Sequence, residues 1–140
     1  MNNIIVSQYH YIKYSYYFSG AGGFTDCNIK NWKVMLENNE MNKPVGTVRY
    51  GDDESAHYMN DNSMVEEDMG VILSQKSVNE LVTIVSDWSI GLKTSKPAGP
   101  GCSIQEKLIL GGQNDLILGF DNERKKKLEI WCKNNGLSLS

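Results

Sequence analysis

The chain has 140 residues, of which 40% are hydrophobic and 22% are charged, and its formal net charge is −3 at pH 7. This length suits a single domain over residues 1–140 with one core, and the composition excludes extensive disorder. The acidic balance argues against direct binding of nucleic acid.

The cysteines and the N-terminus bear on where the protein works. Cys27, Cys102 and Cys132 are far apart and odd in number, whereas secreted scaffolds hold dense, even-numbered cysteines. His10 and Lys13 interrupt the apolar start, which also lacks a basic region, so a secretory signal is excluded. No window approaches the roughly 18 uncharged apolar residues of a membrane span. We therefore predict reduced thiols, a cytoplasmic location and no membrane contact.

The first half of the chain predicts alternating strands and loops around one helix. Residues 4–18 are rich in Ile, Val and Tyr and contain no Gly or Pro, which predicts one long strand. Thr25 or Asp26 then caps a helix with Ile29, Trp32 and Leu36 on its apolar face.

The next part of the chain predicts two strands joined by a long loop. Residues 45–50 predict a short strand, and residues 69–73 are apolar enough for another. Residues 51–68 between them are polar and irregular, so we expect a long loop.

The second half predicts two helices and a hairpin. Ser77 and Glu80 have the spacing of a capping box, and a helical apolar face follows with Val78, Leu81, Val82, Val85, Trp88 and Leu92. Residues 94–101 hold Pro and Gly and predict a loop. The apolar runs 108–111 and 116–119 flank a turn, so we expect a hairpin covered on both faces.

The last element is a helix capped by Asp121, with Leu128, Trp131 and Cys132 on one face. Gly136 followed by Leu137 predicts a Schellman end. Strands and helices thus mix without regular βαβ alternation. The expected fold class is α+β, a mostly antiparallel sheet with about three helices packed on it.

Tyrosines gather near the N-terminus, at positions 9, 11, 14, 16 and 17. Such a row forms a stacking platform for bases when basic residues interleave with it, but only Lys13 does so here. The alternative is a strand that uses aromatic side chains for cross-strand packing.

No residue pattern indicates an enzyme, a metal site or a cofactor. His10 and His57 are the only histidines, and neither has the spacing of a zinc ligand pair. Cys102 follows a Gly/Pro segment and serves as a nucleophile only if the fold brings a base such as His57 to it.

Charge is distributed unevenly along the chain. Residues 1–50 carry +2, residues 51–70 carry −7 with no Lys or Arg, and residues 71–140 carry +2. The acidic stretch suits a basic partner, with a solubilising surface as the alternative. Arg124 to Lys127 form a basic block at a helix start, either a solvated face or a contact for phosphate or an acidic surface.

In its size, acidity, single-domain build and lack of catalytic residues, the chain resembles the immunity proteins of bacterial polymorphic toxins, such as those of contact-dependent growth inhibition. The resemblance implies a non-enzymatic inhibitor that binds a cognate toxin domain, often a nuclease, in the cytoplasm. The expected contact residues are the acidic ones with Tyr58 and Met64 as apolar anchors: Asp52, Asp53, Glu54, Tyr58, Asp61, Met64, Glu66, Glu67 and Asp68. Two alternatives are a small thiol-dependent hydrolase that uses Cys102 and His57, and a phage or accessory protein that assembles with itself.

Overall fold

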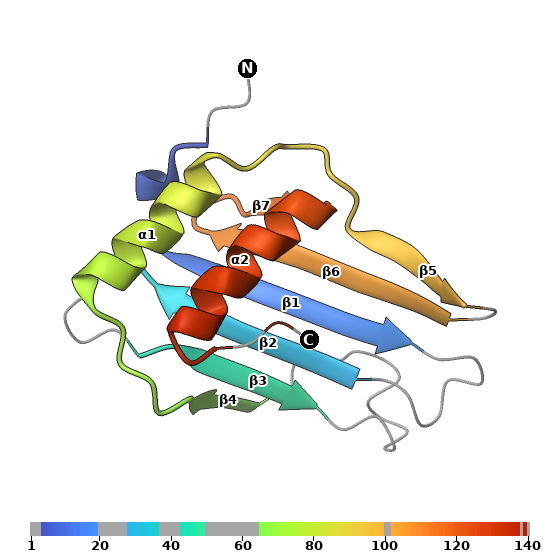
Figure 1. The fold of residues 1–140 in the computed structure, drawn as a ribbon, viewed down its shortest axis with the longest axis horizontal. Helices are drawn as coiled ribbons and strands as arrows, with labels where there is room; N and C mark the ends of the chain where they lie inside the picture. The colour runs from blue at the N-terminus through green and yellow to red at the C-terminus, as the bar shows by residue number, and fades with distance from the viewer. Residues whose placement is uncertain are drawn as a thin grey trace.

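A computed structural model describes residues 4–19, 28–36, 43–49, 65–99, 102–137 and 139. Its described elements, in chain order, are η1 (Val6–Gln8), β1 (Tyr11–Ser19), β2 (Asn28–Met35), β3 (Val45–Arg49), β4 (Val65–Asp68), α1 (Gln75–Ser86), β5 (Ser95–Gly99), β6 (Cys102–Gly111), β7 (Leu116–Leu118) and α2 (Asn122–Asn134). Figure 1 shows α1 and α2 lying side by side across one face of the sheet.

The sheet is antiparallel at every described pairing. Its strand order is β4-β3-β2-β1-β6-β5, and β7 pairs with β6 as well. The predicted class, α+β with an antiparallel sheet, is confirmed. The described residues form two α-helices rather than about three, because one predicted helix is a strand.

That strand is β2, where the sequence predicted a helix with Ile29, Trp32 and Leu36 on one face. Trp32 and Val34 are both buried, which is the two-residue period of a strand. They lie opposite Tyr14 and Ile12 of β1, and β3 pairs along the other edge of β2. Hydrogen bonding on both edges outweighs the helical spacing, since tertiary context overrides local propensity.

The N-terminal segment also departs from the prediction of one long strand. Residues Val6–Gln8 form a 3-10 turn, and the strand begins only at Tyr11. Val6 is buried in the core, whereas Ile5 is exposed. Ile4 is buried as well, so two apolar side chains anchor this segment in the core before β1 enters the sheet.

The predicted loop–strand boundary near residue 68 is displaced. Strand β4 occupies the last four residues of the predicted loop, whereas the predicted strand over residues 69–73 is irregular. Gly70 there has φ 73°, a left-handed conformation that strands do not use. Leu73 is buried, so this segment carries an apolar anchor into α1.

Strand β5 occupies residues 95–99 of the predicted loop over residues 94–101. It contains Pro97, and its register with β6 shifts between Pro97 and Gly99. Proline is tolerated in strands at edges and bulges, and β5 is an edge strand. Proline and glycine therefore mark an irregular edge here instead of a loop.

Helix α1 has the first part of the predicted apolar face but a different start and end. Val78, Leu81 and Val85 are buried, as expected, whereas the helix ends at Ser86, so Trp88 and Leu92 of the predicted face lie beyond it. The N-cap is Ser74, whose hydroxyl accepts a hydrogen bond from the Ser77 backbone N–H at 3.1 Å. The predicted capping box at Ser77 is therefore wrong by one turn, and Ser77 lies inside the helix.

Helix α2 and the hairpin before it follow the sequence more closely. Asp121 caps α2 by accepting from the Arg124 N–H at 2.7 Å, and Leu137 N–H donates to the Cys132 carbonyl in a Schellman end. The predicted β6–β7 hairpin is confirmed. Its expected cover on both faces is wrong, since Ile117 is 51% exposed while Leu118 is buried.

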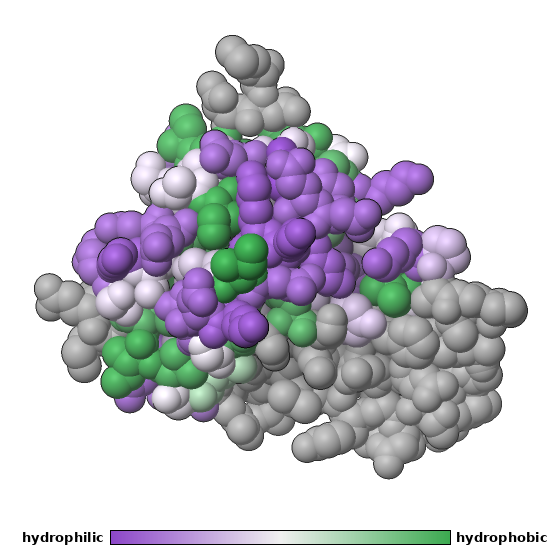
Figure 2. All heavy atoms as spheres, viewed as in Figure 1, coloured by the Kyte–Doolittle hydropathy of each residue, from purple (hydrophilic) through white to green (hydrophobic). Residues whose placement is uncertain are grey.

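The core lies between the sheet and the two helices. Tyr14 stacks on Trp32, which meets Trp131 of α2 with ring centroids 5.9 Å apart. Among the apolar residues that the sequence places on the last two helix faces and in the hairpin, Leu116 is half-buried, and the following are buried: Leu81, Val85, Trp88, Leu108, Leu110, Leu118, Leu128 and Trp131. Figure 2 shows that hydrophilic residues dominate the outer helical face, with smaller apolar patches among them.

Candidate functional site

The predicted acidic contact surface lies mostly outside the described residues. Asp52, Asp53, Glu54, Tyr58, Asp61 and Met64 all belong to that part of the chain. The structure places the backbone of Glu66 and Glu67 in β4, and Asp68 ends this strand. The acidic stretch thus ends in an edge strand, because β4 pairs with β3 alone in the described sheet.

Asp68 is the one predicted contact residue whose side chain is described. Its carboxylate accepts from the Gly70 N–H at 2.7 Å and lies 3.6 Å from the Lys43 ammonium. Both partners of this ion pair are about half exposed (48%), so solvent screens it strongly. Asp68 is therefore held in place yet remains open to a partner.

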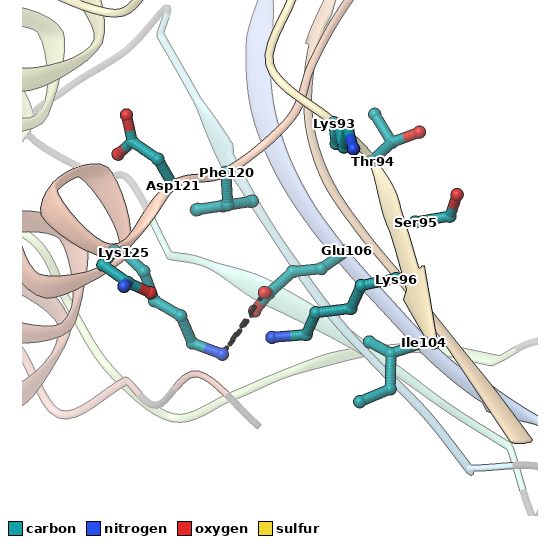
Figure 3. A pocket seen from close by; sticks show the side chains of 10 residues that line it. Lys93, Thr94, Ser95, Lys96, Ile104, Glu106, Phe120, Asp121 and Lys125 are labelled. Atoms are coloured by element: carbon teal, nitrogen blue, oxygen red, sulfur yellow. Dashed lines mark hydrogen bonds and ion pairs between the residues drawn. The ribbon is translucent and has the colours of Figure 1, made fainter. Parts of the chain in front are cut away.

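A pocket of about 230 Å³ lies between β5, β6 and the start of α2. Its lining includes the ammonium groups of Lys93, Lys96 and Lys125 and the carboxylate of Glu106. Figure 3 shows Lys96 and Lys125, from opposite walls, both pointing toward Glu106.

Glu106 is the buried charged residue of the described core, at 5% exposure. Its Oε2 accepts from the Tyr14 hydroxyl at 2.6 Å and lies 3.1 Å from the Lys125 Nζ, which also reaches Oε1 at 3.2 Å. A buried carboxylate is tolerated when its oxygens receive such hydrogen bonds. The cluster therefore connects α2 to two neighbouring strands of the sheet, β1 and β6.

Sequence reasoning missed Glu106, although a signal for it exists. Within β6 the residues that face the helices are Ile104, Glu106, Leu108 and Leu110, so a single charged residue interrupts an apolar alternation. A charge in the buried phase of a strand indicates an ionic partner on a packed element. Which residue supplies that partner follows only from the packing of α2.

The basic block 124–127 is divided among several environments. Arg124 donates to the Ser89 hydroxyl at 3.0 Å and is half-buried, and Lys125 pairs with Glu106. Lys127 lies 3.5 Å from Glu123 on the next turn of α2. A uniformly solvated face is therefore the wrong description, since two of the four cations tie α2 to the rest of the domain.

The tyrosine row is likewise divided. Tyr14 is fully buried and Tyr16 is partly buried on the same face, which confirms cross-strand and core packing for these two. Tyr11 lies on the opposite face of β1, where the Lys33 ammonium sits 5.2 Å from its ring centroid.

The alternative of a thiol-dependent hydrolase rests on Cys102 and His57, which lie at the edge of the described residues or outside them. Cys102 begins β6 with its backbone opposite Gly99, and His57 lies outside the described residues. Cys132, by contrast, is buried in the core, and burial together with nearby Glu129 raises the pKa of its thiol to about 12. A thiol with so high a pKa is a poor nucleophile, so Cys132 has a packing role.

Two kinds of feature are absent from the described ranges, a membrane-spanning helix and a cluster of metal ligands. No helix there is long and apolar enough to cross a membrane. No three His, Cys, Asp or Glu side chains of that part gather as metal ligands would.

Comparison with known proteins finds no relative of this chain. No protein family matches the sequence, and no curated protein or solved structure is significantly similar to it. The fold class, an α+β domain with an antiparallel sheet under two helices, is thus the level at which this protein is classified.

Proposed function

We propose that this chain is a non-enzymatic binding protein that neutralises a cognate toxin domain, a basic one such as a nuclease. The observation that carries the proposal is the charge of residues 51–70, with seven carboxylates and no Lys or Arg. Like charges at this density repel one another and favour expansion of a lone domain. A basic groove on a partner converts this repulsion into attraction.

The position of this segment supports the proposal. It ends in edge strand β4, away from the packed helices, and its last carboxylate, Asp68, is exposed. The only ion pair of Asp68 in the described residues is the solvent-screened one with Lys43. A partner can therefore approach this edge without displacing any part of the described core.

The proposal predicts that a toxin domain is encoded beside the gene for this chain, and the experiment uses that domain as the partner. Asp52→Asn, Asp53→Asn and Glu54→Gln together should slow association by roughly tenfold at low salt, because charge steers encounter. The same variant should depend less on salt, whose screening length is about 8 Å at physiological ionic strength. Stopped-flow association rates at two salt concentrations measure both effects.

A matched control changes the net charge equally at the helices. Glu80→Gln, Asp87→Asn and Glu129→Gln neutralise three exposed carboxylates on or beside the helices. This control should bind within about twofold of the parent, because charges beyond a screening length contribute little. Equal rates for the parent and the 52–54 variant, or failure of the parent to inhibit the toxin domain, would refute the proposal.

A further inference from the structure

The pocket between β5, β6 and the start of α2 is small and combines charged groups with an apolar wall. Its volume of about 230 Å³ equals that of roughly eight water molecules, at about 30 Å³ each. The space therefore suits a ligand of about that many non-hydrogen atoms, which is smaller than a drug molecule. The described lining contains no residue of the acidic stretch 51–70, so this inference does not rest on the proposed function.

Backbone hydrogen bonds hold the walls of the pocket together. The Glu106 N–H donates to the Thr94 carbonyl at 2.7 Å, and the Phe120 N–H donates to the Lys93 carbonyl at 3.1 Å. The segment that leads into β5 is therefore fastened both to β6 and to the segment that leads into α2. Walls that are held in this way bind a ligand without the entropic cost of ordering them first.

The two carboxylate oxygens of Glu106 are unequally occupied. Oε2 accepts from the Tyr14 hydroxyl and lies close to the Lys125 ammonium, whereas Oε1 accepts from Lys125 alone among the described residues, at 3.2 Å. Each oxygen of an ionised carboxylate has lone pairs for two donors. Oε1 therefore has room for one further donor from the pocket that Glu106 lines.

Lys96 faces Glu106 across the pocket (Figure 3). Within the described part of the chain Glu106 forms its ion pair with Lys125, and none joins it to Lys96. The space between the Lys96 ammonium and the Glu106 carboxylate is therefore a place for a ligand that carries two kinds of group. An anionic group suits Lys96, and a hydrogen-bond donor suits Glu106.

The charges around the pocket favour a hydroxyl over an ammonium as that donor. A ligand ammonium at Glu106 would lie beside the Lys125 ammonium on the same carboxylate, and like charges at such a distance repel. Asp121 offers no second acceptor at this place, because it caps α2 and its carboxylate points away from Glu106 in Figure 3. A neutral hydroxyl meets neither obstacle.

An apolar wall completes the pocket. Ile104 and Phe120 are half-buried and line it. The Phe120 ring is held edge-on to Tyr14 and Trp88, with centroid distances of 5.9 Å and 5.2 Å. This wall suits a short aliphatic chain on the ligand, since apolar surface removed from water stabilises the complex.

We propose that this pocket binds a small 2-hydroxy acid with a short apolar chain. The hydroxyl of the ligand donates to Glu106, its carboxylate meets Lys96, and its chain packs on Ile104 and Phe120.

The test is an NMR titration of the isotope-labelled protein with three acids that share one carbon skeleton. The hydroxy acid, 2-hydroxy-4-methylpentanoate, should bind with a dissociation constant on the order of 1 mM or below and shift signals of the residues that line the pocket. The acid that lacks the hydroxyl, 4-methylpentanoate, should bind at least about tenfold more weakly, because it leaves the buried acceptor without its donor. Leucine, with an ammonium in place of the hydroxyl, should bind more weakly for the reason of charge.

Two exposed lysines provide a variant and its matched control. Lys96→Gln should weaken binding of the hydroxy acid by about fivefold or more, because the ligand carboxylate loses its cation. Lys133→Gln, near the other end of α2, should change binding by less than about twofold, since solvent screens a charge so far from the pocket.

The inference would be overturned if the hydroxy acid shifted no signal of the pocket. Equal binding of 4-methylpentanoate would also overturn it, because Glu106 would then contribute nothing to recognition. Tighter binding of leucine or of inorganic phosphate, or equal effects of the two lysine variants, would do the same.

Discussion

Glu106 shows how one residue can connect three elements. Its carboxylate on β6 accepts from Tyr14 of β1 and pairs with Lys125 of α2. Removing one partner of a buried pair leaves a charge that solvent cannot reach, which costs more than the pair itself contributes. This cost can be tested by comparing Lys125, which pairs with Glu106, with its exposed neighbour Lys126.

Lys125→Met should lower the free energy of unfolding by about 2–3 kcal/mol, because Glu106 then keeps Tyr14 as its only donor among these groups. Lys126→Met should change it by less than about 0.5 kcal/mol, since Lys126 is exposed and forms no ion pair in the described residues. Urea unfolding of both variants measures the difference. Similar values would mean that the Glu106–Lys125 contact is solvated and energetically unimportant.

Because Cys132 is buried, its thiol makes the stability of the fold decrease at alkaline pH. The folded thiol has its pKa raised to about 12, above the value of 9.0 expected in an unfolded chain. Between these values the unfolded chain releases a proton that the folded chain keeps, so stability falls as pH rises. The expected slope is about 1.4 kcal/mol per pH unit from this one group.

Cys132→Ala removes that contribution, although it also loses packing. Its free energy of unfolding should therefore start lower and fall less steeply between pH 9 and 11 than that of the parent. Denaturant unfolding over this range gives both slopes, and Cys27 and Cys102 remain in both proteins as an internal control. Parallel slopes would show that the thiol titrates normally in the folded state.

At the scale of elements, the structure and the sequence pattern name different residues as the N-cap of α1: Ser74 in the structure and Ser77 in the sequence. Ser74→Ala removes the hydroxyl that accepts from Ser77 N–H and should cost about 1 kcal/mol. Ser77→Ala should cost less than about 0.5 kcal/mol, because the Ser77 hydroxyl only accepts an exposed hydrogen bond from the Ser74 hydroxyl at 3.2 Å, and the contact with Trp131 is made by the backbone carbonyl of Ser77. Thermal unfolding of the two variants ranks them, and the capping box predicted from sequence requires the reverse order.

The elements predicted correctly share a local cause. Helix α2 has its cap, apolar face and Schellman glycine within its own sequence, and the β6–β7 hairpin has matching apolar runs around a turn. The prediction of a helix over strand β2 was wrong because two patterns coincide there. Ile29, Trp32 and Leu36 have spacings of three and four residues, and Trp32, Val34 and Leu36 have a two-residue period. Only pairing with β1 and β3 decides between the two periods.

At the scale of the whole molecule, the two charged surfaces differ in how far sequence reveals them. Counting charges along the chain identifies the acidic residues 51–70, because they are contiguous. Lys13, Lys33 and Lys107 come from three strands that only pairing brings together, so the count along the chain does not show them as a group. In sequence only Lys13 interleaves with the tyrosine row, whereas strand pairing brings Lys33 and Lys107 next to it.

The sheet ends differently on its two sides, and this has a consequence for solubility. Strand β6 shares one edge between β5, which contains Pro97 and a register shift, and β7, which has only three residues. At the other side, β4 has the sequence Val-Glu-Glu-Asp. Short strands, proline, bulges and charge all hinder an incoming strand from extending a sheet. The described sheet therefore carries features on both of its sides that hinder fibrillar stacking.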